Sequence, residues 1–396
     1  MKKTCPLRAS LLILVLAFAA SPFARAQTNL QIGRAALAQQ TPEALETAHQ
    51  AFKTGLQTTP NNAELNFFYA ATLFTREAHT AEFKQQFTSL NATIVNPSIY
   101  ALEYSFPLGF AGILQPPARV STDAHLTYLN SKAALIDEAV ACLDKITDGN
   151  FTLTLASSET SLLDTKVDFA DVCLLRAVLR LARASLHLAN SYNLSGEYRK
   201  LYDLYAAGNL TPQAVLAAFP QLFNLSTTPA QRSDARTQIQ LAHGEWNTAL
   251  AAIKATRPAS KGSVLGPLGE SDTAPFLFAF DSIAAAEEVD VLFDTLVSSL
   301  SSQVTVPAIA TENFALEGQR INLSNLVTSP SGPRFLAPTR FDRGFFRPST
   351  WPDATLSGIF PDATQDLMND AGNLFFVLQP NRIRTLPILA PRRHSR

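Results

Sequence analysis

Four basic side chains recur in one stretch of the chain at a spacing that places them on one face of a helix. They are Arg176, Arg180, Arg183 and His187. Steps of four, three and four residues return to the same side of an α-helix, so these side chains share a narrow stripe. Guanidinium groups bind carboxylates and other anions through two parallel hydrogen bonds. The spacing predicts either an anion-binding surface or a salt-bridged helix edge whose partners are Asp137 and Asp144.

A second candidate site is segment 334–351, in which arginine and aromatic residues are interleaved. The residues that define this candidate are Arg340, Phe341, Arg343, Phe346 and Trp351. Aromatic rings stack on sugar rings, and nearby arginines attract anionic groups. The pattern predicts a surface for an acidic glycan or another polysaccharide. The alternative is an extended segment whose aromatic side chains pack on the protein while its arginines face water.

Two cysteines, Cys142 and Cys173, lie in two segments with helical patterns. If these helices pair antiparallel, both residues lie at the same level near the connected ends of the hairpin. A disulfide between them is then geometrically feasible, and an exported protein can keep one. The alternative is a pair of buried free thiols.

The local signatures of common enzyme and metal sites are absent from the sequence. It contains no His-Glu-x-x-His, no Cys-x-x-Cys, no Gly-x-Ser-x-Gly, no Ser-x-x-Lys and no phosphate-binding or dinucleotide-binding glycine loop. We therefore assign no catalytic residue, no metal ligand and no cofactor, and we favour a protein that is not an enzyme. A hydrolase whose carboxylates come together only in the folded chain remains an alternative.

The elements that must position these residues are predicted to be mainly helical. Apolar residues recur at steps of three and four over 123–147, and a second amphipathic segment covers 168–191. Asp168 or Asp171 suits the N-terminus of this second helix, where a carboxylate favours the helix dipole. Between the two helices, segment 151–155 alternates with a period of two, which is typical of a short strand.

The C-terminal third has a different pattern. We expect a helix over 282–302, and from Gln303 onward proline, glycine and brief alternations predict short strands and extended chain. The expected fold class is therefore mainly α, with antiparallel helical hairpins followed by a smaller mixed, strand- and loop-rich C-terminal region.

Segment 41–74 resembles the boundary between two tetratricopeptide (TPR) repeats, which are helix pairs that stack into arrays. The residues at the family's positions are Ala48, Phe52, Gly55, Pro60, Tyr69, Ala70 and Leu73, with Gly55 in place of a usual alanine. A weaker likeness at 241–253 puts Gly244, Trp246, Ala249 and Ile253 in the turn and second helix of such a unit. The resemblance implies a scaffold that binds proteins or peptides, and it implies no chemistry. Segment 352–361 is also similar to stretches of secreted bacterial proteins, which carries no functional implication.

The N-terminus has the features of a secretory signal peptide over residues 1–26. A basic start precedes an apolar core at 11–20, and Ala24, Arg25 and Ala26 form a cleavage pattern of small residues. We expect a mature chain from Gln27, in the periplasm or outside the cell, with no transmembrane segment after cleavage. The alternative is an uncleaved membrane anchor. A nucleic-acid partner is not expected for an exported chain.

The expected organisation continues from this signal peptide in four parts. They are a helical-hairpin domain at 27–256, a linker or long loop at 257–274, a helix plus mixed region at 275–389, and a disordered tail at 390–396.

Composition and charge narrow the class of protein. The chain has 396 residues, of which 46% are hydrophobic and 16% charged, so it can bury a large core and is not a disordered or collagen-like chain. Residues 27–331 carry 19 basic and 28 acidic side chains, a net charge of −9, whereas residues 332–396 carry 9 and 5, a net charge of +4. We expect an exported, non-enzymatic protein-interaction or scaffold protein of the bacterial envelope, with a protein partner. An anionic glycan is the alternative ligand.

Overall fold

The chain is described from a computed structural model. The described residues are 22–89, 91–96, 103–105, 121–160, 164–209, 212–222, 229–256, 283–305, 307, 318, 320–324, 340–342, 347–350, 361 and 382–384. They are mostly helical with a few short antiparallel strands, as the expected fold class requires. Residues 1–21 of the predicted signal peptide, the predicted linker at 257–274 and the predicted tail at 390–396 lie outside the described residues.

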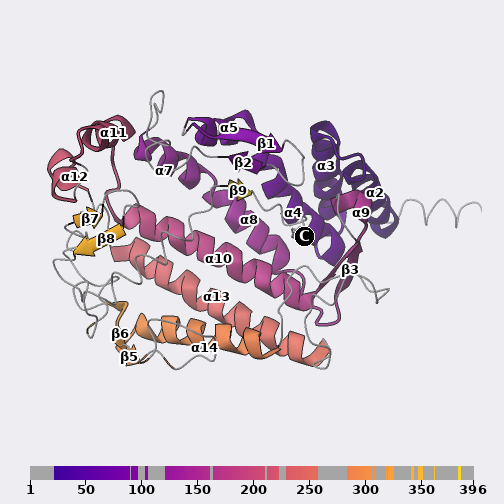
Figure 1. Ribbon diagram of the computed structural model, residues 1–396. Helices are drawn as coiled ribbons and strands as arrows, with labels where there is room; N and C mark the ends of the chain where they lie inside the picture. The colour runs from indigo at the N-terminus through magenta and orange to yellow at the C-terminus, as the bar shows by residue number, and fades with distance from the viewer. Residues whose placement is uncertain are drawn as a thin grey trace, which may run out of the picture.

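Four helices form the N-terminal part of the described chain. They are α2 (Pro22–Leu37), α3 (Pro42–Thr58), α4 (Ala63–Ala78) and α5 (Ala81–Thr88). Thr41, Asn62 and Thr80 cap the last three, because each side-chain oxygen accepts a backbone N–H of the first turn. Helix α3 packs against both α2 and α4, so these three helices form one layered unit (Figure 1).

The contact between α2 and α3 depends on a glycine. A Cβ atom built on Gly33 would lie 2.2 Å from Cε1 of Phe52, so only glycine lets the fully buried Phe52 ring lie against α2. The Phe52 ring in turn stacks on Phe68 of α4, with ring centroids 5.0 Å apart. Gly55 is similarly constrained, because its Cβ would lie 2.8 Å from Cδ1 of the buried Leu65. The resemblance to TPR repeats places Gly55 where alanine is usual, and the close approach of Leu65 explains the smaller residue.

The predicted long helix over 123–147 is two helices, so that expectation was wrong in detail. They are α7 (Thr122–Ser131) and α8 (Ala133–Leu143), and Lys132 lies between them. The ammonium group of Lys132 contacts Glu77 at 3.1 Å and Glu82 at 3.0 Å. These carboxylates hold the interrupted turn against α4 and α5. Helix α8 also ends at Leu143, before the predicted end at residue 147, and the Phe151 N–H donates to the Asp148 carbonyl in a turn that follows.

A short hairpin connects α8 to the next long helix. It consists of β3 (Thr152–Leu155) and β4 (Thr165–Asp168), which pair antiparallel, and of α9 (Ser157–Thr160) between them. The strand predicted at 151–155 is confirmed, and its alternating burial matches the period of two. Arg34 of α2 donates two hydrogen bonds to Glu159 of α9, at 2.6 and 2.8 Å, and a third to the Thr154 carbonyl at 2.9 Å. The hairpin is therefore attached to the N-terminal unit.

The central helix is α10 (Phe169–Ser191), which confirms the helix predicted over 168–191. The Asp168 side chain accepts the Asp171 N–H and the Asp171 side chain accepts the Asp168 N–H, which forms a capping box. Downstream helices are α11 (Tyr198–Ala206), α12 (Pro212–Ala218), α13 (Pro229–Thr256) and α14 (Ile283–Ser299). Helices α8, α10, α13 and α14 lie side by side in Figure 1, and each packs on the next.

Alanines at every seventh position line the contact between α10 and α13. They are Ala170, Ala177 and Ala184 on α10, and Ala235, Ala242 and Ala249 on α13, and all are buried. Arg176 pairs with Glu245 at 2.9 Å, and Ala170 near the start of α10 lies in one core cluster with Ile253 near the end of α13. The two helices are therefore antiparallel, in a register that brings the two series level with each other. Small side chains at this spacing let two helices approach closely along their length.

The turn that the second resemblance to a TPR unit places at Gly244 is not formed. Gly244 lies inside the continuous helix α13 and not in a turn, and no atom lies within 4 Å of the position that its Cβ would take. Trp246, Ala249 and Ile253 pack instead on Ala170 and Leu174 of α10. The glycine was misread because its neighbours have the small-residue spacing of a helix pair, which here serves the contact with α10.

Short strands lie mostly in the C-terminal region, as predicted, and one of the described C-terminal strands, β9, pairs with an earlier strand. One sheet has the order β1 (Thr93–Asn96), β2 (Glu103–Ser105) and β9 (Arg382–Arg384), all antiparallel. The other pairs are β5 (Val304–Thr305) with β6 (Arg320–Ile321), and β7 (Arg340–Asp342) with β8 (Arg347–Thr350). None of the described helices is long and apolar enough to span a membrane.

Candidate functional site

The basic stripe of α10 lies in the crevice between α8 and α13. Arg176 contacts Asp144, the C-cap residue of α8, at 3.4 Å and Glu245 of α13 at 2.9 Å. Arg180 joins the same two carboxylates at 3.3 and 3.6 Å. These two arginines therefore connect three adjacent helices through one network of ion pairs.

Glu245 is the partner that the sequence analysis missed. Burial raises the pKa of this carboxyl group, and the adjacent Arg176 and Arg180 counteract that effect. A buried carboxylate needs such partners, since an uncompensated charge in a helix interface is costly. The seven-residue alanine spacing in both helices was a sequence signal that would have indicated the α10–α13 pairing, and with it this partner.

The stripe continues toward the C-terminal end of α10. Nε of Arg183 donates to Oδ1 of Asp137 at 3.0 Å. Burial, and then the charge of Arg183, lower the pKa of His187, while Asp234 and Asp137 act in the opposite direction. The sequence-based pairing of this stripe with Asp137 and Asp144 is confirmed. The guanidinium charges thus already have carboxylate partners, which weakens the alternative of an open anion-binding surface.

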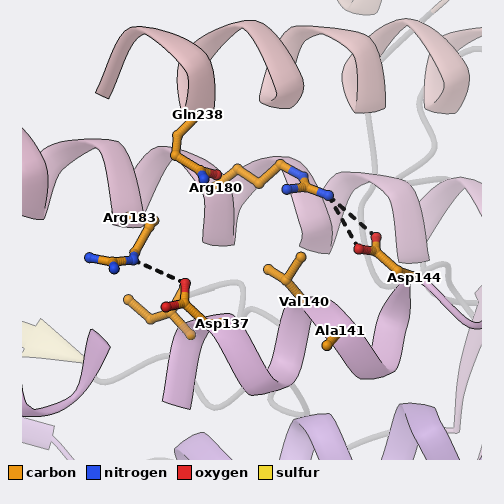
Figure 2. Close-up of a pocket in the computed structure, with 8 residues that line it drawn as sticks. Asp137, Val140, Ala141, Asp144, Arg180, Arg183 and Gln238 are labelled. Atoms are coloured by element: carbon orange, nitrogen blue, oxygen red, sulfur yellow. Dashed lines mark hydrogen bonds and ion pairs between the residues drawn. The ribbon is translucent and has the colours of Figure 1, made fainter. Parts of the chain in front are cut away.

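A shallow pocket of about 140 Å³ lies over these ion pairs (Figure 2). Its polar lining residues are Asp137, Asp144, Arg180, Arg183 and Gln238, and its apolar lining residues are Ile136, Val140 and Ala141. The two ion pairs lie at opposite ends of the view in Figure 2, with Val140 and Ala141 on α8 between them and Gln238 on α13 across from them. The pocket therefore combines an apolar floor with charged groups of both signs.

The two cysteines are free, so the disulfide considered from the sequence is not formed. They occupy different parts of the core: Cys142 lies in the cluster that includes Leu143 and Tyr69, whereas Cys173 packs with Trp246 and Ala249. Their side chains thus leave the α8–α10 hairpin in different directions, although their levels along it are similar. Burial raises the pKa of both thiols, which keeps them protonated and unreactive near neutral pH.

The basic-aromatic candidate is described only in part. Arg340 and Phe341 lie in β7, which pairs antiparallel with β8, with Arg340 opposite Thr350 and Phe341 opposite Pro348. Arg343, Phe346 and Trp351 lie outside the described residues.

A buried polar cluster between α3, α4 and α8 was also missed. Nδ1 of His49 lies 3.0 Å from Oγ1 of Thr72, which itself donates to the Tyr69 carbonyl at 3.0 Å. Because the hydroxyl proton of Thr72 is used in that bond, His49 must donate through Nδ1–H. The Tyr69 hydroxyl donates to Glu138 of α8 at 2.6 Å, and the His49 and Tyr69 rings stack. With His49 only 2% exposed, this cluster holds helices together and has no access for a substrate.

The described residues contain no group of three histidine, cysteine, aspartate or glutamate side chains arranged to hold a metal ion. No family model, curated protein or solved structure matches the chain.

Proposed function

We propose that the chain is a protein-interaction or scaffold protein of the bacterial envelope, exported by its N-terminal segment and working without catalysis. One observation carries the proposal: the residues of the TPR-like pattern on α3, Ala48, Phe52 and Gly55, are all buried, and α3 packs against both α2 and α4. Proteins of that family use stacked helix pairs to present a surface to other proteins. We propose that α8, α10, α13 and α14, each of which packs on the next, extend this unit into an array.

The described array also exposes large apolar side chains that its own packing does not use. Ile32 on α2 is 47% exposed, Val178 on α10 is 52% exposed and Leu241 on α13 is 43% exposed. Single exposed apolar residues are common on proteins, so these positions serve here as probes of the surface and do not define a site.

The test is photo-cross-linking in the native envelope followed by mass spectrometry. A photoreactive amino acid is placed at Ile32, Val178 or Leu241, one position per variant, and at Tyr205 as the control. Tyr205 is exposed but lies on α11, a helix with no buried residue. We expect one reproducible protein to be captured from an array position and not from Tyr205. Capture of no protein from any array position would contradict the proposal.

Binding of an acidic glycan is a second candidate, which the β7–β8 pairing favours because it places Arg340, Phe341 and Arg347 in one hairpin. Alanine at Arg340, Phe341, Arg343 and Phe346 should abolish retention of the protein on an immobilised acidic polysaccharide. Unchanged retention in this variant would assign the segment a packing role only.

A further inference from the structure

In both ion pairs at the pocket, the carboxylate is more exposed to solvent than the guanidinium group. The Asp137 side chain is 56% exposed and its partner Arg183 is 21% exposed. The Asp144 side chain is 43% exposed, against 13% for Arg180. A molecule that approaches this crevice therefore meets carboxylates before it meets guanidinium groups.

The exposed carboxylates have capacity for a further partner. The contacts of Asp144 with Arg176 and Arg180 measure 3.3 to 3.4 Å, longer than the roughly 2.7–2.9 Å of a strong charge-assisted hydrogen bond. Asp137 accepts from Arg183 through Oδ1. A carboxylate offers about four lone-pair sites, so an additional donor can bind either group without removing the arginine.

The size and floor of the pocket limit what this donor can be. Its volume of about 140 Å³ is close to that of a cavity of roughly 150 Å³ that holds a benzene molecule. A single long side chain is of this size. Val140 and Ala141 offer an apolar surface to an aliphatic stem, and the Gln238 carboxamide adds a hydrogen-bonding group on the opposite wall.

We propose that this pocket receives a lysine or arginine side chain of a partner protein. The aliphatic stem of that side chain lies on Val140 and Ala141, and its cationic end binds Asp137 or Asp144. Charge complementarity supports this choice, since residues 27–331 carry 19 basic and 28 acidic side chains, a net charge of −9, which steers a basic surface toward the array. The inference rests on the proposed function, because it names the chemistry of the partner at one place on the same array.

The first experiment uses n-butylammonium as a probe, because it reproduces the end of a lysine side chain. Methyl resonances of Ile136, Val140 and Ala141 are followed during titration of the full chain, with n-butanol and butanoate as neutral and anionic probes at equal ionic strength. We expect saturable shifts with n-butylammonium that are at least fivefold larger than those with either control probe. An equal or larger response to butanoate or n-butanol overturns the proposal.

Two variants and one control variant test whether the n-butylammonium response comes from this pocket. Asp137→Asn should reduce it at least threefold, and Ala141→Lys should abolish it because the new ammonium group, one turn from both Asp137 and Asp144, occupies the pocket. Ala141→Gln, of similar length and uncharged, should retain most of the response. Since Ala141 is exposed, its substitutions leave the core intact even if Asp137→Asn unfolds the chain. An unchanged response in Ala141→Lys overturns the assignment of the site.

The same variants separate this inference from the proposed function. If a partner is captured in the envelope and Ala141→Lys reduces its capture while Ala141→Gln does not, the pocket is the docking point. Capture that is unaffected by Ala141→Lys overturns the pocket as the docking point and leaves the scaffold proposal standing. Absence of any captured protein overturns the scaffold proposal, even where the pocket binds n-butylammonium.

Discussion

One buried histidine, His49, should make the stability of this protein depend on pH. His49 is almost fully buried between α3 and α4, where its ring is stacked on Tyr69 and bonded to Thr72. Burial, and then the charge of Arg76, lower the pKa of His49 to about 4, against 6.5 for the free side chain. The folded protein therefore holds this imidazole neutral in a pH range where the unfolded chain binds a proton.

The free energy of unfolding should fall as the pH drops from about 6.5 to about 4, and the His49 contribution is complete above that window. The depression of the pKa corresponds to a loss of roughly 3 kcal/mol at most across the window. Urea unfolding of the wild type and of His49→Gln at several pH values measures the effect, because the glutamine cannot titrate. A difference between the two proteins that stays constant from pH 7 to pH 4.5 would falsify this prediction.

Helix positions were predicted from the sequence where the residues that determine them are close neighbours in the chain. The start of α10 was predicted because Asp168 and Asp171 form a capping box within the helix's own first turn. The interruption between α7 and α8 was not predicted, because the acids that hold Lys132 belong to α4 and α5 and lie some fifty residues earlier in the chain. The directions of Cys142 and Cys173 likewise depend on which helices flank the hairpin, which no spacing within it shows.

Two helical glycines should respond in opposite ways to the same substitution. Gly33→Ala should destabilise the protein by roughly 1–3 kcal/mol, because the new Cβ would lie 2.2 Å from the buried Phe52 ring. This loss exceeds the gain of about 1 kcal/mol that alanine brings to a helix. Gly244→Ala has open space around it and should stabilise by up to about 1 kcal/mol. Thermal and urea unfolding measure both, and a stable Gly33→Ala variant would refute the close packing of α2 on α3.

The alanine contact between α10 and α13 gives a second pair of variants. Ala177→Leu should cost roughly 1–3 kcal/mol, because it forces apart two helices that pack closely along their length. The neighbouring Val178 is 52% exposed, so Val178→Leu should change stability by less than about 0.5 kcal/mol. Chemical denaturation of the two variants in parallel distinguishes overpacking from a general effect of leucine on the helix.

At the scale of the whole molecule, ion pairs join parts of the chain that the sequence analysis treated separately. The basic stripe was predicted with its acids on α8, since the two segments form a hairpin. Its third partner, Glu245, and the Arg34–Glu159 pair both connect segments far apart in sequence. The alanine spacing of α10 and α13 indicates the first of these connections, and no periodicity indicates the second. Residue type and spacing thus identified which side chains mattered on α10, but not the surface that they form with α13.

Loss of the Arg34 side chain should destabilise the fold by about 2–3 kcal/mol, because the buried carboxylate of Glu159 keeps its hydrogen bond from the Ala156 N–H but loses its cationic partner. The Glu159 side chain is only 5% exposed. Arg76→Ala is the matched control, since the Arg76 and Glu46 side chains are 42% and 47% exposed, and surface pairs contribute less than about 1 kcal/mol. Equal losses in the two variants, measured by urea unfolding at pH 7, would contradict the special role of the Arg34 pair.

The separation of Arg34 and Glu159 in sequence also determines when this ion pair can form during synthesis of the chain. The two residues are 125 positions apart. At a synthesis rate of about 5–20 residues per second, the acid is made roughly 6–25 s after the base, whereas a helix forms within about a microsecond. During that interval α2, α3 and α4 can associate with one another and with α5, α7 and α8, which are made before Glu159, but Arg34 lacks its carboxylate partner. The α2–α4 unit therefore lacks this ion pair until the middle of the chain has been made, and a factor that acts on α2 has seconds in which to reach it before the pair forms.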